Sequence, residues 1–330
     1  MTISKIKNLI QLALSLGIAG WIFWYLYKDI EVSSLWSQLK SSNWIWIEAS
    51  LSIAWLGFWI RGWRWSLLIQ DPTGSKVSAN RAYHAAMVGY LANLMIPRAG
   101  ELVRCGMLSK TNGKPVGHLI GTVLVERSID LLFLIGTIIL AFLVENQLFT
   151  SLASQLIDIP SLLIKLNRHW PTVLAGLTVF GLILYYFFSK FRNHGLVAKL
   201  KAFARQMLSG IKSIQSLRQP KGFWLSSLTI WIFYFLTMAT VAFGIPSTAN
   251  LTYGEVLLVM VMGSIGMVAP VQGGIGTFHA LVAYILIQFG VIETDAKIFA
   301  AIIHGTQVLL VLITGLYSWI YLLRVQTKTT

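Results

Sequence analysis

The chain has 330 residues, of which 56% are hydrophobic and 12% charged, with a mean hydropathy of +0.70. Soluble domains carry roughly twice that share of charge, so the composition excludes an ordinary soluble enzyme and a disordered chain. The net charge of +14 lies in loops between apolar runs, which favours a membrane surface over nucleic acid as the partner. A single cysteine, Cys105, and the lack of zinc-type spacing predict no internal disulfide, no metal and no cofactor.

Six apolar runs reach the length of about 20 residues that a helix needs to cross a bilayer. The first follows Lys5 and Lys7 and has no small-residue cleavage site after it, so we expect an uncleaved span. Two further apolar regions are interrupted by clusters of Gly and Pro, and each is either a pair of spans or a re-entrant hairpin. The six runs are residues 9–27, 43–60, 116–144, 171–189, 223–244 and 296–323, and the interrupted regions are 82–110 and 255–291.

The distribution of Lys and Arg favours the re-entrant interpretation, because cytoplasmic loops are enriched in these residues. The segment 190–221 carries eight of them and no acidic residue. With both interrupted regions re-entrant, 19 of the 26 Lys and Arg lie on the cytoplasmic side, five lie outside and two at membrane depth. The cytoplasmic segments are then the N-terminus, the loops at 61–81, 102–115 and 190–221, and the C-terminus. A full span at 82–96 would instead move Arg104, Lys110 and Lys114 outside. We therefore expect both termini to be cytoplasmic.

These elements predict an all-α polytopic membrane protein with about six full spans and two re-entrant helical hairpins in a single membrane domain, residues 1–330. The order span, span, hairpin, span occurs in a first half, 1–150, and again with opposite orientation in a second half, 168–330. Two such halves form an inverted repeat, and in transporters built this way the broken helices meet near the midplane and form the substrate site.

The first interrupted region places ionisable residues at membrane depth, where they are costly and point to function. A guanidinium there can hold phosphate or carboxylate through two hydrogen bonds, and free amides at the start of the returning helix, near Gly100, also favour an anion. The alternative is that Arg98 and Glu101 simply pair with each other at a buried turn. The candidate substrate-binding residues of this region are Asn93, Arg98, Glu101 and Arg104.

The span at 116–144 contains three charged residues within five positions, Glu126, Arg127 and Asp130. Spacings of three and four residues put them on neighbouring helix faces that must point into the protein. They form either an ion-pair lock between helices or a substrate or proton site. Glu48, in the second span, is a candidate partner for one of the arginines.

The second interrupted region has a glycine-rich turn that allows positive φ angles and close backbone approach. Its glycines do not match the dinucleotide-binding fingerprint, because His279 occupies the third glycine position. His279 and His304 are either proton carriers or ordinary packing residues. The candidate substrate-binding residues here are Gln272, Gly273, Gly274, Gly276 and His279.

Residues 196–214 place apolar side chains on one stripe and Lys and Arg elsewhere, which predicts an amphipathic helix on the cytoplasmic surface. Its four cations, Lys199, Lys201, Arg205 and Lys212, would contact anionic lipid. Membrane lipids are thus the expected partners, nucleic acid is not, and formation of a homo-oligomer stays open.

Three ordered motifs resemble the flippase-like membrane domain of lysylphosphatidylglycerol synthases and its stand-alone relatives. They are Asn93 with Pro97-Arg98-x-Gly100-Glu101-x-x-Arg104, then Glu126-Arg127-x-x-Asp130, then Pro270 with Gly273-Gly274-Ile275-Gly276. The resemblance implies translocation of a lipid between leaflets of the cytoplasmic membrane. This chain departs from the family at Gln272 and His279, where Pro-x-Pro-Gly-Gly and a final Glu are common, which puts a preference for a cationic headgroup in doubt.

The function expected from the sequence is a lipid flippase or transporter in the cytoplasmic (inner) membrane rather than an enzyme. No Gly-x-x-x-x-Gly-Lys-Ser/Thr run occurs, and no soluble aminoacyl-transferase domain follows the last span within these 330 residues. Two alternatives stay open. One is a membrane enzyme for lipid-linked substrates that uses Glu126 or Asp130 as acid or base, and the other is a non-catalytic partner subunit of an envelope-lipid enzyme.

Overall fold

The computed structural model describes residues 17, 20–69, 77–96, 98–146, 178, 214–269 and 271–326. Within these residues the regular structure is entirely helical, as the sequence predicts. The labelled elements are α2 (Val32–Ser41), α3 (Trp44–Leu68), α4 (Ala79–Met95), α5 (Gly100–Asn112), α6 (Val116–Val144), α11 (Pro220–Gly244), α12 (Tyr253–Val268), η1 (Gln272–Gly274), α13 (Thr277–Gln288) and α14 (Glu293–Gln326).

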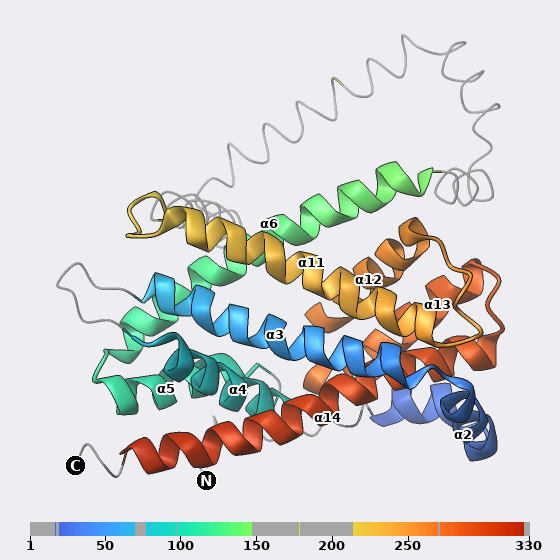
Figure 1. Ribbon diagram of the computed structural model, residues 1–330, viewed down its shortest axis with the longest axis horizontal. Coiled ribbons are helices and arrows are strands. Elements are labelled where there is room, and N and C mark those ends of the chain that lie inside the picture. Colours follow the sequence, from blue (N-terminus) through green and yellow to red (C-terminus); the bar gives the residue numbers. More distant parts are fainter. Residues whose placement is uncertain are drawn as a thin grey trace.

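Four long helices, α3, α6, α11 and α14, run between the same two ends of the molecule (Figure 1). Helices α3 and α11 pack antiparallel, since the amide of Asn43 donates to the carbonyl of Gly244 at 2.7 Å at one end. At the other end Arg64 donates to the hydroxyl of Ser227 at 3.3 Å. This frame holds two shorter helical hairpins, α4–α5 and α12–α13.

The first interrupted region, 82–110, folds as the hairpin α4–α5. The two helices cross where Gly89 and Gly100 meet, and a Cβ on Gly100 would collide with the carbonyl oxygen of Gly89. The side-chain oxygen of Asn93 accepts a hydrogen bond from the amide of Gly100 at 2.7 Å and so caps α5. At the turn between the helices, Arg98 has a φ of 60°, a backbone conformation that residues other than glycine rarely adopt.

The second interrupted region, 255–291, folds as α12, the short turn η1 and α13. Here Gly266 of α12 packs directly on Phe278, because a Cβ at Gly266 would lie 2.7 Å from the Cα of Phe278. In the turn, Gly273, Gly274 and Gly276 have φ angles of 54°, 77° and 86°. The expectation that these glycines supply positive φ is therefore confirmed.

The two hairpins start from opposite ends of the molecule and their tips meet (Figure 1). A guanidinium nitrogen of Arg98 donates to the carbonyl oxygen of Val268, at the end of α12, at 3.2 Å. Beside it, a Cβ on Gly273 would lie 2.9 Å from a methyl carbon of Leu94. The two Gly/Pro interruptions of the sequence therefore lie against each other in space.

The predicted spans at 116–144, 223–244 and 296–323 correspond to α6, α11 and α14, the three described helices that are long and apolar enough to cross a membrane. The span predicted at 43–60 is α3, which continues to Leu68. The assignment of Arg61 and Arg64 to a cytoplasmic loop was wrong, because both lie buried within α3. The span at 171–189, nearly all of the basic helix at 196–214, and most of the span at 9–27 lie outside the described residues.

Candidate functional site: a buried arginine and carboxylate cluster

Seven ionisable side chains from α3, α5 and α6 form one network of ion pairs. We call it the arginine cluster. Most of the pairs join different helices, so the network ties α3 and α5 to the charged face of α6. Its members are Arg61 and Arg64 of α3, Glu101 and Arg104 of α5, and Glu126, Arg127 and Asp130 of α6.

Glu126 is the centre of the cluster and its side chain is fully buried. One carboxylate oxygen accepts from Arg61 and Arg64 at 3.2 Å each, and the other lies 3.0 Å from a guanidinium nitrogen of Arg104. An isolated carboxylate is not tolerated at such a position, whereas three guanidinium groups from two other helices compensate its loss of hydration.

Asp130 lies one helical turn after Glu126 and pairs with the same two arginines of α3. The distance is 2.7 Å to Arg64 and 3.3 Å to Arg61. Arg61 also donates to the hydroxyl of Tyr234, which brings α11 into contact with the network. The spacing of three residues between Arg61 and Arg64 lets both face α6 from α3.

Arg104 is held from two sides. Its guanidinium carbon lies 4.6 Å from the ring centroid of Trp65, a distance typical of a cation–π contact. The indole nitrogen of Trp65 donates in turn to the hydroxyl of Thr122 at 3.0 Å. Arg104 is almost fully buried, so its orientation is set by packing and by its pair with Glu126.

The cluster reaches the surface at Arg127 and Glu101, whose side chains are 40% and 41% exposed and pair at 2.6 Å. Arg127 also lies 3.6 Å from Asp130. We call this pair the mouth of the cluster. Four arginines face three carboxylates, so the cluster carries a net charge of +1. An excess cation is unfavourable in an apolar medium unless an anion or water approaches it. The exposed mouth is the part of the cluster that an anion can approach.

The residues predicted around the first hairpin separate into two groups. Glu101 and Arg104 join the arginine cluster, but Arg98 stands at the exposed hairpin tip and donates to Val268. The predicted alternative of a pair between Arg98 and Glu101 was wrong, since Glu101 pairs with Arg127. Of the amides expected to be free near Gly100, that of Gly100 itself is not, because Asn93 accepts its hydrogen.

The residues predicted in the second hairpin lie apart from the arginine cluster, at the turn and the start of α13. Gln272 is 1% exposed and His279 is 5% exposed. A ring nitrogen of His279 accepts from the amide of Gly276 at 3.3 Å. The rings of His279 and His304 lie 4.7 Å apart between centroids, which places α13 against α14. We call these two residues the histidine pair.

Two central members of the cluster, Arg61 and Arg64, were missed by the sequence interpretation. Conversely, Glu48 was expected as a partner of a buried arginine, but its side chain lies exposed on α3. A usable signal was present. Arg61 and Arg64 alternate with Trp63 and Trp65, and the first proline after them is Pro72, so nothing in the sequence ends the helix at residue 60.

Comparison with known families agrees with these motifs. The family model described as the lysylphosphatidylglycerol synthase TM region matches residues 9–315, nearly the whole chain. The chain belongs to this family. The arginine cluster and both hairpins lie inside the matched region of this lysylphosphatidylglycerol synthase membrane domain. A search of curated proteins and of solved structures gives no significant match.

Proposed function

We propose that this protein moves a lipid between the leaflets of the cytoplasmic membrane and holds the anionic part of the headgroup at the mouth of the arginine cluster. One observation carries the proposal. A buried network with one more cation than anions opens at Arg127, beside the hairpin tip that presents Arg98. Glu101, the partner of Arg127, follows Arg98 by three residues, so both arginines flank the start of α5. A phosphate approaching there would meet two guanidinium groups.

We infer that the two hairpins are re-entrant. Helices α4, α5, α12 and α13 have 17, 13, 16 and 12 residues. At 1.5 Å per residue these give lengths of about 18–26 Å, shorter than the hydrocarbon core of about 30 Å. Each hairpin also begins and ends near one end of the molecule (Figure 1). A broken backbone at that depth is tolerated where it is buried in protein or lines a water-filled cavity, and at the meeting tips Arg98 donates to the carbonyl oxygen of Val268.

The same arrangement supports an inverted repeat of residues 1–150 and 168–330, with α3, α4–α5 and α6 corresponding to α11, α12–α13 and α14. Because Arg61, Arg64 and Arg104 are buried, they no longer count as cytoplasmic, and 16 Lys and Arg remain on that side against five outside. This excess still favours an orientation with both termini inside. Relative movement of the two halves would then open the mouth to each leaflet in turn.

The proposed activity is transport and not chemistry. The cluster offers carboxylates saturated by guanidinium groups, a poor setting for a general acid or base, and the chain has no nucleotide-binding Gly-x-x-x-x-Gly-Lys-Ser/Thr run. Transport would therefore follow an ion gradient or the lipid gradient itself.

The test is lipid translocation in proteoliposomes with labelled anionic, zwitterionic and cationic lipids. Wild type is run beside Arg98→Ala and beside Lys110→Ala, an exposed cation at the far end of α5 that serves as the matched control. We expect phosphate-bearing lipids to move, Arg98→Ala to lose at least tenfold in rate, and Lys110→Ala to match wild type. Folded protein that moves no lipid would overturn the proposal in favour of a membrane enzyme or a partner subunit.

A further inference from the structure

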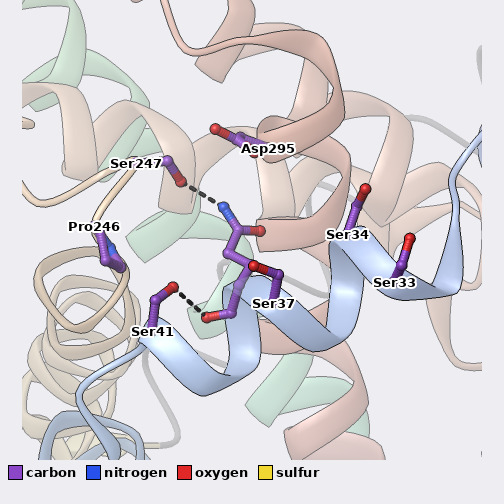
Figure 2. Close-up of a pocket in the computed structure, with 8 residues that line it drawn as sticks. Ser33, Ser34, Ser37, Ser41, Pro246, Ser247 and Asp295 are labelled. Carbon is purple, nitrogen blue, oxygen red and sulfur yellow. Dashed lines mark hydrogen bonds between the residues drawn. The ribbon is translucent and has the colours of Figure 1, made fainter.

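Helix α2 lies at the end of the molecule opposite α5 (Figure 1). A polar pocket lies against α2. Its volume is about 710 Å³, it opens to the surface, and it is lined by α2, the loop between α11 and α12, and the first turn of α14. Figure 2 shows side chains of all three segments directed toward the same space. The residues lining this pocket are Ser33, Ser34, Ser37, Gln38, Ser41, Pro246, Ser247 and Asp295.

Gln38 is the buried polar group of the pocket, with 9% of its surface exposed. Its amide nitrogen donates to the hydroxyl of Ser247 at 2.7 Å, which joins α2 to the loop after α11. Its amide oxygen is buried and has no hydrogen-bond partner within the part of the chain that the structure describes. A buried acceptor in this state is unfavourable, so a donor that reaches it from the pocket that Gln38 lines would be stabilised there.

The lining selects against anions and against alkylated ammonium groups. None of the lining residues is Lys, Arg or His, so an anion would meet no cationic side chain and would be repelled by the carboxylate of Asp295. None is aromatic, so an alkylated ammonium group would lack the ring faces that such groups prefer. What remains is a set of hydroxyls with one amide oxygen and one carboxylate, which suits a ligand bearing several hydroxyl groups.

The surroundings of α2 place this pocket at the membrane interface. Trp36 and Val32 on the same helix are 59% and 80% exposed. The ammonium nitrogen of Lys40 lies 5.5 Å from the centre of the Trp36 ring. Exposed Trp beside Lys at the end of a membrane helix bundle is typical of residues at headgroup level. A headgroup carried by a lipid can therefore reach the pocket from the bilayer, and a free molecule can reach it from the water.

We propose that the pocket around Gln38 is a second binding site, separate from the arginine cluster, for a polyhydroxylated group of the sugar or polyol class. Hydroxyls of the ligand donate to the amide oxygen of Gln38 and to the carboxylate of Asp295, and the serine hydroxyls donate to and accept from the ligand. The site is independent of the transport proposal, because it lies on other helices and is measured by binding alone.

The experiment measures binding to the purified full chain in a polyoxyethylene detergent, which carries neither sugar nor ammonium, by native mass spectrometry and calorimetry. The probes are monoglucosyl diacylglycerol, free methyl glucoside and phosphatidylcholine. We expect the glucosyl lipid or the free glucoside to bind, with Kd raised about tenfold by Gln38→Leu and by Asp295→Asn. Preference for the lipid over the glucoside assigns the site to a headgroup, and the reverse assigns it to a free sugar.

Two further variants separate a ligand contact from a loss of structure. Ser247→Ala removes the partner of the Gln38 amide nitrogen but keeps the amide oxygen, so we expect a smaller loss than with Gln38→Leu. Ser52→Ala, at an exposed serine of α3, should bind as wild type does. Tighter binding of phosphatidylcholine than of either glucosyl probe would overturn the proposal, as would glucosyl binding that Gln38→Leu and Asp295→Asn leave unchanged in folded protein.

Discussion

The two helical hairpins share a construction but differ in their charge. In each, glycines allow two short helices to cross closely, and a side chain accepts the amide hydrogen of a glycine at the start of the returning helix. Around α4–α5 lies the arginine cluster of four arginines and three carboxylates, buried except for Arg127 and Glu101 at its mouth. Around α12–α13 they are histidines and Gln272.

This difference suggests that the residues that build the hairpins are not the ones that carry the buried charge. Glycines and capping side chains suffice to build a hairpin, as α12–α13 shows, so the arginine cluster is not needed for that purpose. Buried ion pairs seldom add net stability compared with apolar packing. A charged network beside only one of two similar hairpins is therefore better explained by a ligand than by folding.

The largest expected effect comes from Glu126→Ala, which leaves three buried guanidinium groups without their shared carboxylate. Loss of one partner of a buried ionic network destabilises by about 3–5 kcal/mol. Thermal unfolding in detergent should show a large fall in Tm or loss of folded protein. Glu48→Ala, at an exposed carboxylate of α3, is the control and should unfold like wild type. Equal stability of the two variants would refute the central position of Glu126.

A smaller effect is expected from Gly100→Ala and Gly266→Ala, which test whether the hairpins are built alike. Each new methyl group would meet backbone atoms of the opposite helix, Gly89 in one hairpin and Phe278 in the other. Overpacking of this kind destabilises by about 1–3 kcal/mol. Gly106→Ala in α5, where a Cβ meets nothing within 4 Å, should be neutral or slightly stabilising. If only one of the two substitutions were destabilising, the two hairpin crossings would not be built alike.

Removal of the side-chain acceptors should have a similar, modest effect in both hairpins. Asn93→Ala and His279→Ala each delete one hydrogen bond, to the amides of Gly100 and Gly276. We expect about 1 kcal/mol of destabilisation for each. Hydrogen exchange should quicken at the corresponding glycine amide and little elsewhere. Unchanged exchange at either glycine would show that the side chain does not protect that glycine's amide hydrogen from exchange.

The smallest effect concerns Glu145, a carboxyl group just beyond α6 that pairs with no arginine among the described residues. Burial raises the pKa of Glu145, and the nearby carboxylate of Glu255 raises it further. A raised pKa means that ionisation opposes folding, so this contribution to stability is present at low pH and is lost as pH rises through that pKa. Glu145→Gln should therefore raise Tm slightly at pH 7 and leave it unchanged at pH 4. A lower Tm of Glu145→Gln than of wild type at pH 7 would contradict a raised pKa of Glu145.

Local patterns predicted the helices well but the partners of the charges poorly. The apolar lengths of α6, α11 and α14 and both Gly/Pro interruptions are visible in the sequence, because they depend on neighbouring residues. The pairing of Arg127 with Glu101, rather than Arg98 with Glu101, depends on how α5 packs against α6. Arg61 and Arg64 were missed for a different reason. Charge at the end of an apolar run suggests a loop, although a buried carboxylate on another helix can keep such residues inside.

We propose that the mouth of the arginine cluster binds a headgroup anion and does more than lock two helices together by an ion pair. Arg127→Gln and Glu101→Gln test it most directly, because the two side chains pair with each other and are almost equally exposed. Translocation of an anionic lipid by both variants is measured in proteoliposomes against wild type. We expect Arg127→Gln to lose at least tenfold in rate and Glu101→Gln, which releases Arg127, to keep or exceed the wild-type rate. Equal loss in both variants would contradict the claim and leave the pair as a lock between helices.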